Sequence, residues 1–424
     1  MLSNLDVLEI GETISAGAAG TMLGKFGAHA TRLRGSPSDG PRGDGRTQRD
    51  RLLQILAMAG AKDVISFAGG FPDPLTFPGA ALAEILRELA DRGDASPFQY
   101  SPTEGLPGPR DYVSDRLERL EGRRPGEGEL MLTSGAVEAM ELIGKAFLDR
   151  GDRVLVEAPT YLGAIMAFQG FEAVVEGVPL DGDGLAVDEL ERRLASGPAP
   201  KLLYTIPDYQ NPAGVTLSAE RREALVELAR RHGILVLEDV AYRELSFENE
   251  RAPSLWSLAP EIVVQAGTFS KTFFPGVRLG WAAGPAEVVA KLVWAKQNTD
   301  QCAGALGQRL LEEYGRRGHL DEGLERARGL YRARRDAIMA ALDRYAGDRA
   351  SWTRPEGGFF TWLDLPPGSD AAAAAGRALE AGVAVVPGPP FFPAGGGERH
   401  LRLSFSRADE AEIDEGIRRL GQLL

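Results

Sequence analysis

The chain has 424 residues, of which 43% are hydrophobic and 26% are charged, and its formal net charge at pH 7 is −13. This length suits two domains around a large core, and the acidic balance argues against a nucleic-acid partner, because phosphate binding needs a basic footprint. The single cysteine, Cys302, excludes an intramolecular disulfide framework and fits a reducing compartment.

Metal and membrane sites are not indicated either. The histidines, His29, His232, His319 and His400, are scattered without a pair at ligand spacing. The amino terminus lacks the basic and apolar regions of a secretory signal, and no apolar run reaches the roughly 18 residues of a transmembrane helix. We therefore expect a cytoplasmic protein without a metal, a membrane partner or a nucleic-acid partner.

The amino-terminal region has two parts. Residues 1–46 are rich in Gly, Ala and Ser and end in GSPSDGPRGDGR, which predicts a flexible, loosely ordered arm. Residues 47–80 contain a helical apolar pattern over 47–59 and then ISFAGGFPDPLTFP, a brief strand and a loop, and we expect them to pack with a smaller domain. The double glycine of this loop allows backbone to approach a ligand closely, although a simple turn would also explain it.

Residues 81–320 are predicted to form a large domain. Two helices, separated by a loop that carries Tyr100, come before an alternation of apolar strands and amphipathic helices. We expect strands at 129–133, 153–157, 201–206, 233–238, 262–266 and 280–283, and helices at 137–148, 219–231 and 285–298. This alternation predicts an α/β fold with a mostly parallel sheet and helices on both faces. A second α/β pattern, with strands near 358–362, 383–386 and 401–405, predicts a small domain over 321–424.

Polar residues follow successive strands, at the edge where open parallel sheets bind ligands. The first strand runs into a turn, Ser134 to Val137, and a helix whose free amides suit a phosphate, although such residues also cap ordinary helices. Tyr161 follows the second strand, where it can stack on a planar ring or simply pack. Asn211 follows the third, where its amide can donate to a phenolate oxygen or belong to an ordinary turn.

The fourth and fifth strands end in Asp239 and near Lys271. A carboxylate at the end of so apolar a strand needs a cation or strong hydrogen bonds, and a protonated pyridine nitrogen is such a cation; a helix cap is the alternative. Lys271 lies among Thr268, Ser270 and Arg278, which suits an amine that binds a carbonyl cofactor as a Schiff base while its neighbours bind a phosphate. The alternative is a surface loop with an isolated lysine. Together, these strand ends describe a site for pyridoxal 5′-phosphate.

The sequence also resembles the fold-type I pyridoxal-phosphate enzymes of the class I/II aminotransferases, most closely the branch of 2-aminoadipate aminotransferase and kynurenine aminotransferase II. The resemblance covers residues from about 48 to 424 and rests on ISFAGGFPDPLTFP, QYSPTEG, LTSGA, EAPTYLGAI, YTIPDYQNPAG, EDVAYREL, TFSKTFFPGVRLG, RPEGGFFTW and LRLSFS. It implies a mostly parallel seven-stranded sheet, a smaller carboxy-terminal domain, and a homodimer with active sites at the interface.

By this resemblance, Lys271 forms the Schiff base with the cofactor and acts as the catalytic base, and Asp239 pairs with the pyridine nitrogen. Asn211 and Tyr242 contact the ring oxygen, and Tyr161 stacks on the ring. The phosphate site implied by the resemblance consists of Thr268, Ser270, Arg278 and the turn Ser134, Gly135, Ala136 and Val137, with Tyr100 reaching in from a second subunit. Close relatives commonly carry Ser and Gln where this chain has Ala136 and Val137, so this turn is expected to hold the phosphate through backbone amides alone.

The resemblance also implies a substrate site. Arg402 matches the arginine that clamps the α-carboxylate, a task suited to a bidentate guanidinium, and Gly70 lies in the loop that closes over it. Arg51 aligns with an arginine that meets distal substrate groups, which points to an acidic or large polar side chain.

The expected reaction is transfer of an amino group from an acidic, 2-aminoadipate-like or aromatic L-amino acid to a 2-oxo acid such as 2-oxoglutarate. A lyase, decarboxylase, racemase or oxidase on the same scaffold is the first alternative, because cofactor motifs do not choose among these reactions. The second is a transcription regulator with a ligand-sensing aminotransferase-like domain. The Gly-rich amino-terminal residues show no helix-turn-helix pattern for that role.

Overall fold

The computed structural model describes residues 6–10, 29–33, 64–248 and 251–424. It contains two compact units, Met1–Thr47 and Gln48–Leu424. In the first unit, β1 (Asp6–Ile10) and β2 (His29–Leu33) pair in parallel, within the segment that its composition predicts to be a loosely ordered arm. The helix predicted over 47–59 lies outside the described residues.

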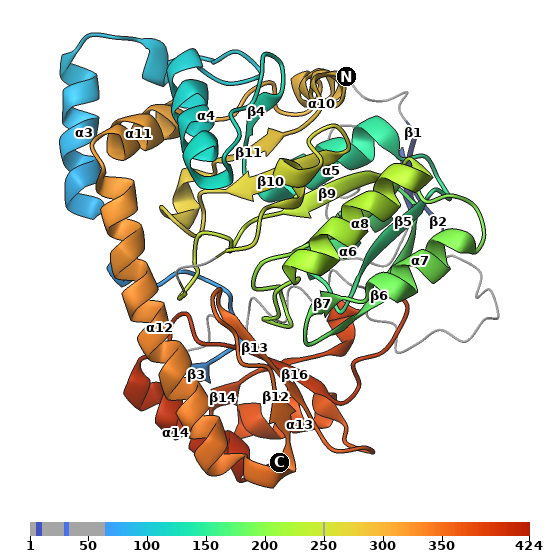
Figure 1. Cartoon of the computed structure of the whole chain (residues 1–424). Coiled ribbons are helices and arrows are strands. Elements are labelled where there is room, and N and C mark those ends of the chain that lie inside the picture. Colours follow the sequence, from blue (N-terminus) through green and yellow to red (C-terminus); the bar gives the residue numbers. More distant parts are fainter. Residues whose placement is uncertain (1–5, 11–28, 34–63, 249–250) are drawn as a thin grey trace. The chain divides into compact units, whose positions relative to one another are not determined.

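An eight-stranded sheet forms the centre of the second unit, in the order β4-β11-β10-β9-β8-β5-β6-β7 (Figure 1). Its strands are β4 (Leu130–Thr133), β5 (Arg153–Ala158), β6 (Val174–Asp181), β7 (Gly184–Leu185), β8 (Leu202–Thr205), β9 (Leu235–Asp239), β10 (Val263–Thr268) and β11 (Gly280–Ala283). The run from β6 through β5, β8 and β9 to β10 is parallel, whereas β11 is antiparallel to both neighbours. The mostly parallel seven-stranded sheet is thus confirmed, and the two-residue β7 adds an eighth, antiparallel strand at the edge.

The helices of this part are α3 (Gly79–Asp91), α4 (Pro107–Glu121), α5 (Ala136–Phe147), α6 (Leu162–Gly170), α7 (Val187–Ala195), α8 (Ala219–His232), α9 (Leu255–Leu258), α10 (Ala286–Gln297), α11 (Ala305–Arg316) and α12 (His319–Tyr345). Helices α8 and α9 cover one face of the sheet and α5, α6 and α10 cover the other, so neighbouring strand residues pack in different apolar cores. In β9, Val236 packs in one core with residues of α8 and α9, while Leu237 packs in another with residues of α5, α6 and α10. A strand buried on both faces is mostly apolar, and for that reason these strands can be predicted from the sequence.

The carboxy-terminal part has its own sheet and core. Its elements are β12 (Ser351–Trp352), β13 (Phe360–Asp364), α13 (Ala371–Glu380), β14 (Val383–Ala384), β15 (Val386–Pro387), β16 (His400–Ser404) and α14 (Glu410–Gly421). The sheet order is β12-β13-β16-β15, and β14 pairs in parallel with β3 (Ile65–Ser66). The long helix α12 packs against α14 (Figure 1). In the part of the chain that the structure describes, no helix combines the length and the apolar character needed to cross a membrane.

The topology brings the predicted strand ends to one edge. Because β11 is antiparallel to both β4 and β10, β4 runs in the same direction as β10 and the other parallel strands. The carboxyl ends of β4, β5, β8, β9 and β10 therefore meet at the same edge of the sheet, where α/β proteins bind their ligands.

Candidate active site

A pocket of about 340 Å³ lies at this edge. It brings together most of the predicted site residues, namely Gly70, Gly135, Ala136, Val137, Tyr161, Asn211, Asp239, Tyr242, Thr268, Ser270, Lys271, Arg278 and Arg402. These residues come from segments more than 300 positions apart, so only folding makes them neighbours.

Two predicted residues that the structure describes, Ser134 and Tyr100, are not among those lining the pocket. The hydroxyl of Ser134 donates to Asp300 Oδ2 at 3.0 Å. Tyr100 is 75% exposed, so it does not reach the pocket of its own chain. Arg51 lies outside the described residues.

The amine of Lys271 lies inside the pocket and donates to the carbonyl oxygen of Gly70 at 2.8 Å. Burial, together with the positive charges of Arg402 and Arg278, lowers its pKa to about 8, although Asp239 opposes the shift. A lysine with this pKa is present in part as the free base near neutral pH, as a nucleophile or base must be.

Asp239 is buried at the end of β9, with an exposed fraction of only 4%. The hydroxyl of Tyr204 donates to its Oδ2 at 2.9 Å, and the backbone N–H of Ala241 donates to its Oδ1 at 3.0 Å. Burial raises the pKa of this carboxyl to about 6 although both hydrogen bonds lower it. A cationic partner would stabilise the ionised form, and the position fits a protonated pyridine nitrogen.

The preceding residue, Glu238, points away from the pocket, because successive strand residues face opposite sides of a sheet. Its carboxyl accepts the backbone N–H groups of Leu255 and Trp256 at 2.7 and 3.0 Å. It is fully buried, and burial raises its pKa to about 7. Glu238 therefore anchors the start of α9, while Asp239 is left for the ligand.

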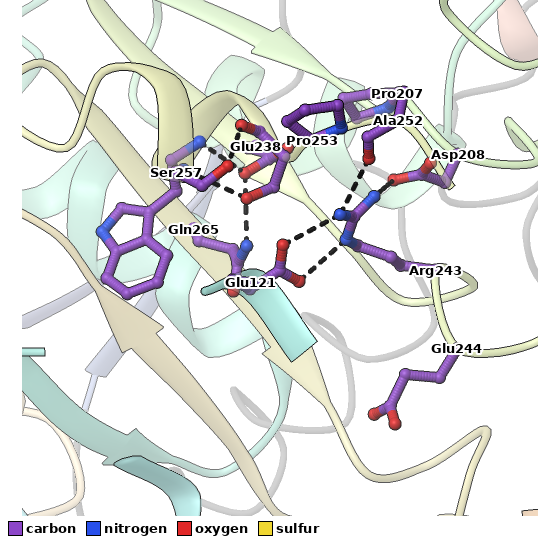
Figure 2. Close-up of polar contacts among 12 residues, drawn as sticks. Glu121, Pro207, Asp208, Glu238, Arg243, Glu244, Ala252, Pro253, Ser257 and Gln265 are labelled. Atoms are coloured by element: carbon purple, nitrogen blue, oxygen red, sulfur yellow. Dashed lines mark hydrogen bonds and ion pairs between the residues drawn. The ribbon is translucent and has the colours of Figure 1, made fainter. Parts of the chain in front are cut away.

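Buried ion pairs fix the two loops that carry Asn211 and Tyr242. Arg243, which follows Tyr242, lies 2.8 Å from Glu121 and 3.0 Å from Asp208 (Figure 2). Asp208 precedes Asn211 by three residues, and its pKa is about 2: burial raises it, but two arginines outweigh that effect. Since these side chains are almost inaccessible, the ion pairs join the two loops rigidly behind the pocket.

The predicted phosphate site is a group of hydroxyls beside a guanidinium and a helix start. The hydroxyl of Thr268 lies 3.0 Å from that of Ser270, and Arg278 donates to Ser270 Oγ at 3.3 Å and to the carbonyl of Ser134 at 2.9 Å. Gly135 immediately precedes α5 and has φ of +110°, a conformation that favours glycine. A Cβ there would also lie 3.0 Å from Arg278 Nη2, so glycine leaves room for the guanidinium beside the helix start.

Arg402 crosses the opposite side of the pocket. It donates to Asn211 Oδ1 at 3.0 Å and to the carbonyl of Ala68 at 2.6 Å, and its guanidinium lies 4.4 and 4.8 Å from the ring centres of Phe360 and Phe391. Its Nε has no hydrogen-bond partner among the described residues. Burial lowers its pKa to about 10, and a substrate carboxylate would supply the missing anion.

The charges of the pocket fit the predicted cofactor. Among the described residues, Lys271, Arg278 and Arg402 line it together with a single carboxylate, Asp239, in a chain whose net charge is −13. A phosphate, a substrate carboxylate and a ring cation complement this set. The residues present therefore fit pyridoxal 5′-phosphate with an amino acid.

Residues 62–420 match the model of the family described as aminotransferase class I and II. The chain belongs to this family. It is an aminotransferase that depends on pyridoxal 5′-phosphate, so the reaction and the cofactor predicted from the sequence are confirmed.

Similar proteins and solved structures support this assignment. The chain is 42% identical to 2-aminoadipate transaminase of Thermus thermophilus over 388 residues, which is 90% of this chain and 96% of that protein. It is 38% identical to aromatic-amino-acid aminotransferase 1 of Thermococcus litoralis, over 88% of this chain and 91% of that protein. The structure of Pyrococcus horikoshii kynurenine aminotransferase, in complex with PMP and kynurenine, is similar with a TM-score of 0.85 and 37% identity, and covers 90% of this chain and 95% of its own.

Sequence reasoning missed several residues of the site. Tyr204 lies in β8 opposite Leu237, in register with β9, so its hydroxyl reaches Asp239 two residues further on. The sequence does not show that β8 and β9 are neighbours. Phe360 belongs to a motif already noted, RPEGGFFTW, but no local signal assigns it to Arg402.

Proposed function

We propose that this aminotransferase takes the amino group from an acidic, 2-aminoadipate-like or aromatic L-amino acid and passes it to a 2-oxo acid such as 2-oxoglutarate. The names of the similar proteins support this range of donors. The observation that carries the proposal is the position of Arg402, an incompletely paired guanidinium between two aromatic rings in the same pocket as Lys271. An α-carboxylate would bind the guanidinium, and the rings would bound the substrate side chain.

We assign the roles of the residues from their surroundings. Bound pyridoxal 5′-phosphate supplies the carbonyl that accepts the amino group and a ring that accepts electrons. The side-chain amine of Lys271 lies in the pocket. As a free base, it moves the proton at substrate Cα. Asp239, oriented by Tyr204, keeps a proton on the ring nitrogen, and Arg402 holds the α-carboxylate.

The remaining cofactor contacts are proposals of the same kind. Asn211 and Tyr242 would bind the ring oxygen, and Tyr161 would stack on the ring. The phosphate would lie among Thr268, Ser270, Arg278 and the amides of Gly135, Ala136 and Val137, in the turn that Ser134 enters; the amide of Ser134 itself donates to Glu138. Arg51 remains our candidate for contact with the distal end of the substrate.

We also propose a homodimer in the cytoplasm, with Tyr100 of each chain completing the phosphate site of the other. Tyr100 is 75% exposed, and other apolar side chains of the same region, Leu75 and Phe98, are 82% and 63% exposed. If these side chains, which are close in the sequence, form one contiguous patch, that patch is typical of a surface that another protein covers. Mixing Tyr100→Ala and Lys271→Ala variants tests the proposal, because a shared site restores activity in mixed dimers. No recovery in dimers shown to have exchanged subunits would refute the shared site.

The absorbance spectrum tests the proposed donors. The purified protein loaded with cofactor should have a visible band that disappears when a true donor is added without an acceptor. Glutamate, 2-aminoadipate and aromatic amino acids should convert it, and the rates rank them. Lys271→Ala should abolish turnover, whereas Lys291→Ala, at an exposed position of α10, should not. A band that no member of the panel converts would refute the proposed donors, and near-normal turnover of Lys271→Ala would refute the role of that residue.

A further inference from the structure

Lys296 is a fully buried lysine that is not among the residues lining the pocket. It lies in α10, and its Nζ is 2.6 and 2.8 Å from the two carboxylate oxygens of Glu138 and 2.7 and 2.8 Å from those of Asp300. A buried ammonium is tolerated only with such partners. The mechanism above leaves this cluster of Lys296, Glu138 and Asp300 without a role.

Both carboxylates of the cluster also hold Ser134, the first residue of the proposed phosphate turn. Glu138 Oε2 accepts the backbone N–H of Ser134 at 2.6 Å, and Asp300 Oδ2 accepts its hydroxyl at 3.0 Å. The carbonyl of Ser134 accepts Arg278 Nη2 at 2.9 Å. Every polar group of Ser134 is thus engaged, and Lys296 holds the two acceptors in place.

This arrangement matters because the turn has few other means of holding an anion. The side chains of Ala136 and Val137 cannot donate hydrogen bonds, so a phosphate here depends on backbone amides whose direction is set by the turn. Ser134 is the residue that enters the turn, and its orientation determines where those amides point. A serine that is fixed on all sides keeps the amides aligned before the cofactor arrives.

We propose that Lys296, through Glu138 and Asp300, is the positioning residue of the phosphate turn and sets the part of cofactor affinity that depends on the phosphate. This inference rests on the proposed binding of the phosphate at the Ser134–Val137 turn. It predicts that replacing Lys296 weakens the binding of ligands that carry a phosphate and leaves the binding of the ring alone unchanged.

The test compares two ligands on the cofactor-free protein, pyridoxal 5′-phosphate and pyridoxal, whose dissociation constants are measured by absorbance titration. Lys296→Met should weaken binding of pyridoxal 5′-phosphate by about tenfold or more, the scale of hydrogen bonds to charged groups, and should leave the pyridoxal constant unchanged. The matched control is Lys145→Met. Lys145 also joins α5 to the end of α10, through Ala295 O, Asn298 O and Thr299 Oγ1, but touches neither the cluster nor Ser134.

A second variant separates positioning from charge and guards against misfolding of the first. Lys296→Met combined with Asp300→Asn removes one charge of each sign, so the net charge of the cluster stays as in the wild type. Persistent, phosphate-selective weakening supports positioning. Wild-type affinity in the double variant, equal weakening for both ligands, or no change in either variant would overturn the proposal. If the wild type itself bound no pyridoxal 5′-phosphate, the proposed function would fail as well, which distinguishes the two failures.

Discussion

Replacing Arg402 by alanine should remove recognition of the substrate α-carboxylate. Arg402 is 6% exposed, and its guanidinium lies 4.4 and 4.8 Å from the centres of two aromatic rings, so water does not readily take its place. Its fixed bonds to Asn211 and Ala68 already orient the fork before substrate binds. The substitution therefore removes both the positive charge and its orientation.

The size of the effect follows from the burial of the charge. Removing one partner of a buried, hydrogen-bonded charge pair costs about 2–5 kcal/mol. At about 1.4 kcal/mol per factor of ten, the apparent KM should rise between about 30-fold and several thousand-fold for every amino-acid donor. The KM of Arg402→Lys should lie between those of the wild type and Arg402→Ala. An ammonium keeps the positive charge but cannot bind both carboxylate oxygens as a guanidinium does.

The assay is the half-reaction of the loaded enzyme with an amino acid and with the corresponding amine that lacks the carboxylate. The wild type should prefer the amino acid strongly, and Arg402→Ala should lose this preference while its slow reaction with the amine is unchanged. An unchanged KM for amino acids would remove Arg402 from the carboxylate site. An equal loss for amino acid and amine would instead show that Arg402 acts by holding Asn211.

Three further substitutions or titrations address other parts of the site. Asp239→Ala should slow the half-reaction by at least about a hundredfold, the scale of a lost electrostatic contact in an active site; a loss of only a few-fold would end its assignment to the ring nitrogen. In the cofactor-free protein, Lys271 should react with an amine-labelling reagent half-maximally near pH 8, because burial lowers its pKa to about 8 and only the free base reacts; a midpoint near the ordinary 10.5 would contradict the buried amine. Arg243→Met should lower the free energy of unfolding in urea by about 3–5 kcal/mol, because it leaves buried carboxylates unpaired. Arg230→Met, which breaks the exposed pair with Glu261, should cost less than about 1 kcal/mol, and equal losses for both arginines would refute the reasoning.

Local sequence determined the strands, the helices and the residues that follow them. The strands β8, β9 and β10 can be predicted because a strand buried on both faces is mostly apolar, although β9 contains Glu238 and β10 contains Gln265. Polar residues such as Asp239 and Lys271 can be recognised for the same reason, because they stand at or just after the end of each apolar run. The family resemblance then gave these residues their roles, and the comparisons confirm the family and the cofactor.

Only the tertiary structure decided which of these groups meet. Tyr204 reaches Asp239 because β8 and β9 are neighbours in register. Arg402 donates to Asn211, 191 positions earlier, and the hydroxyl of Ser134 donates to Asp300, 166 positions later. Periodicity and turn chemistry act over a few residues, whereas these contacts depend on strand order and on the packing of helices distant in the chain. For that reason the residues of the pocket could be predicted from the sequence. That the hydroxyl of Ser134 donates to Asp300, and that Ser134 does not line the pocket, was evident only from the fold.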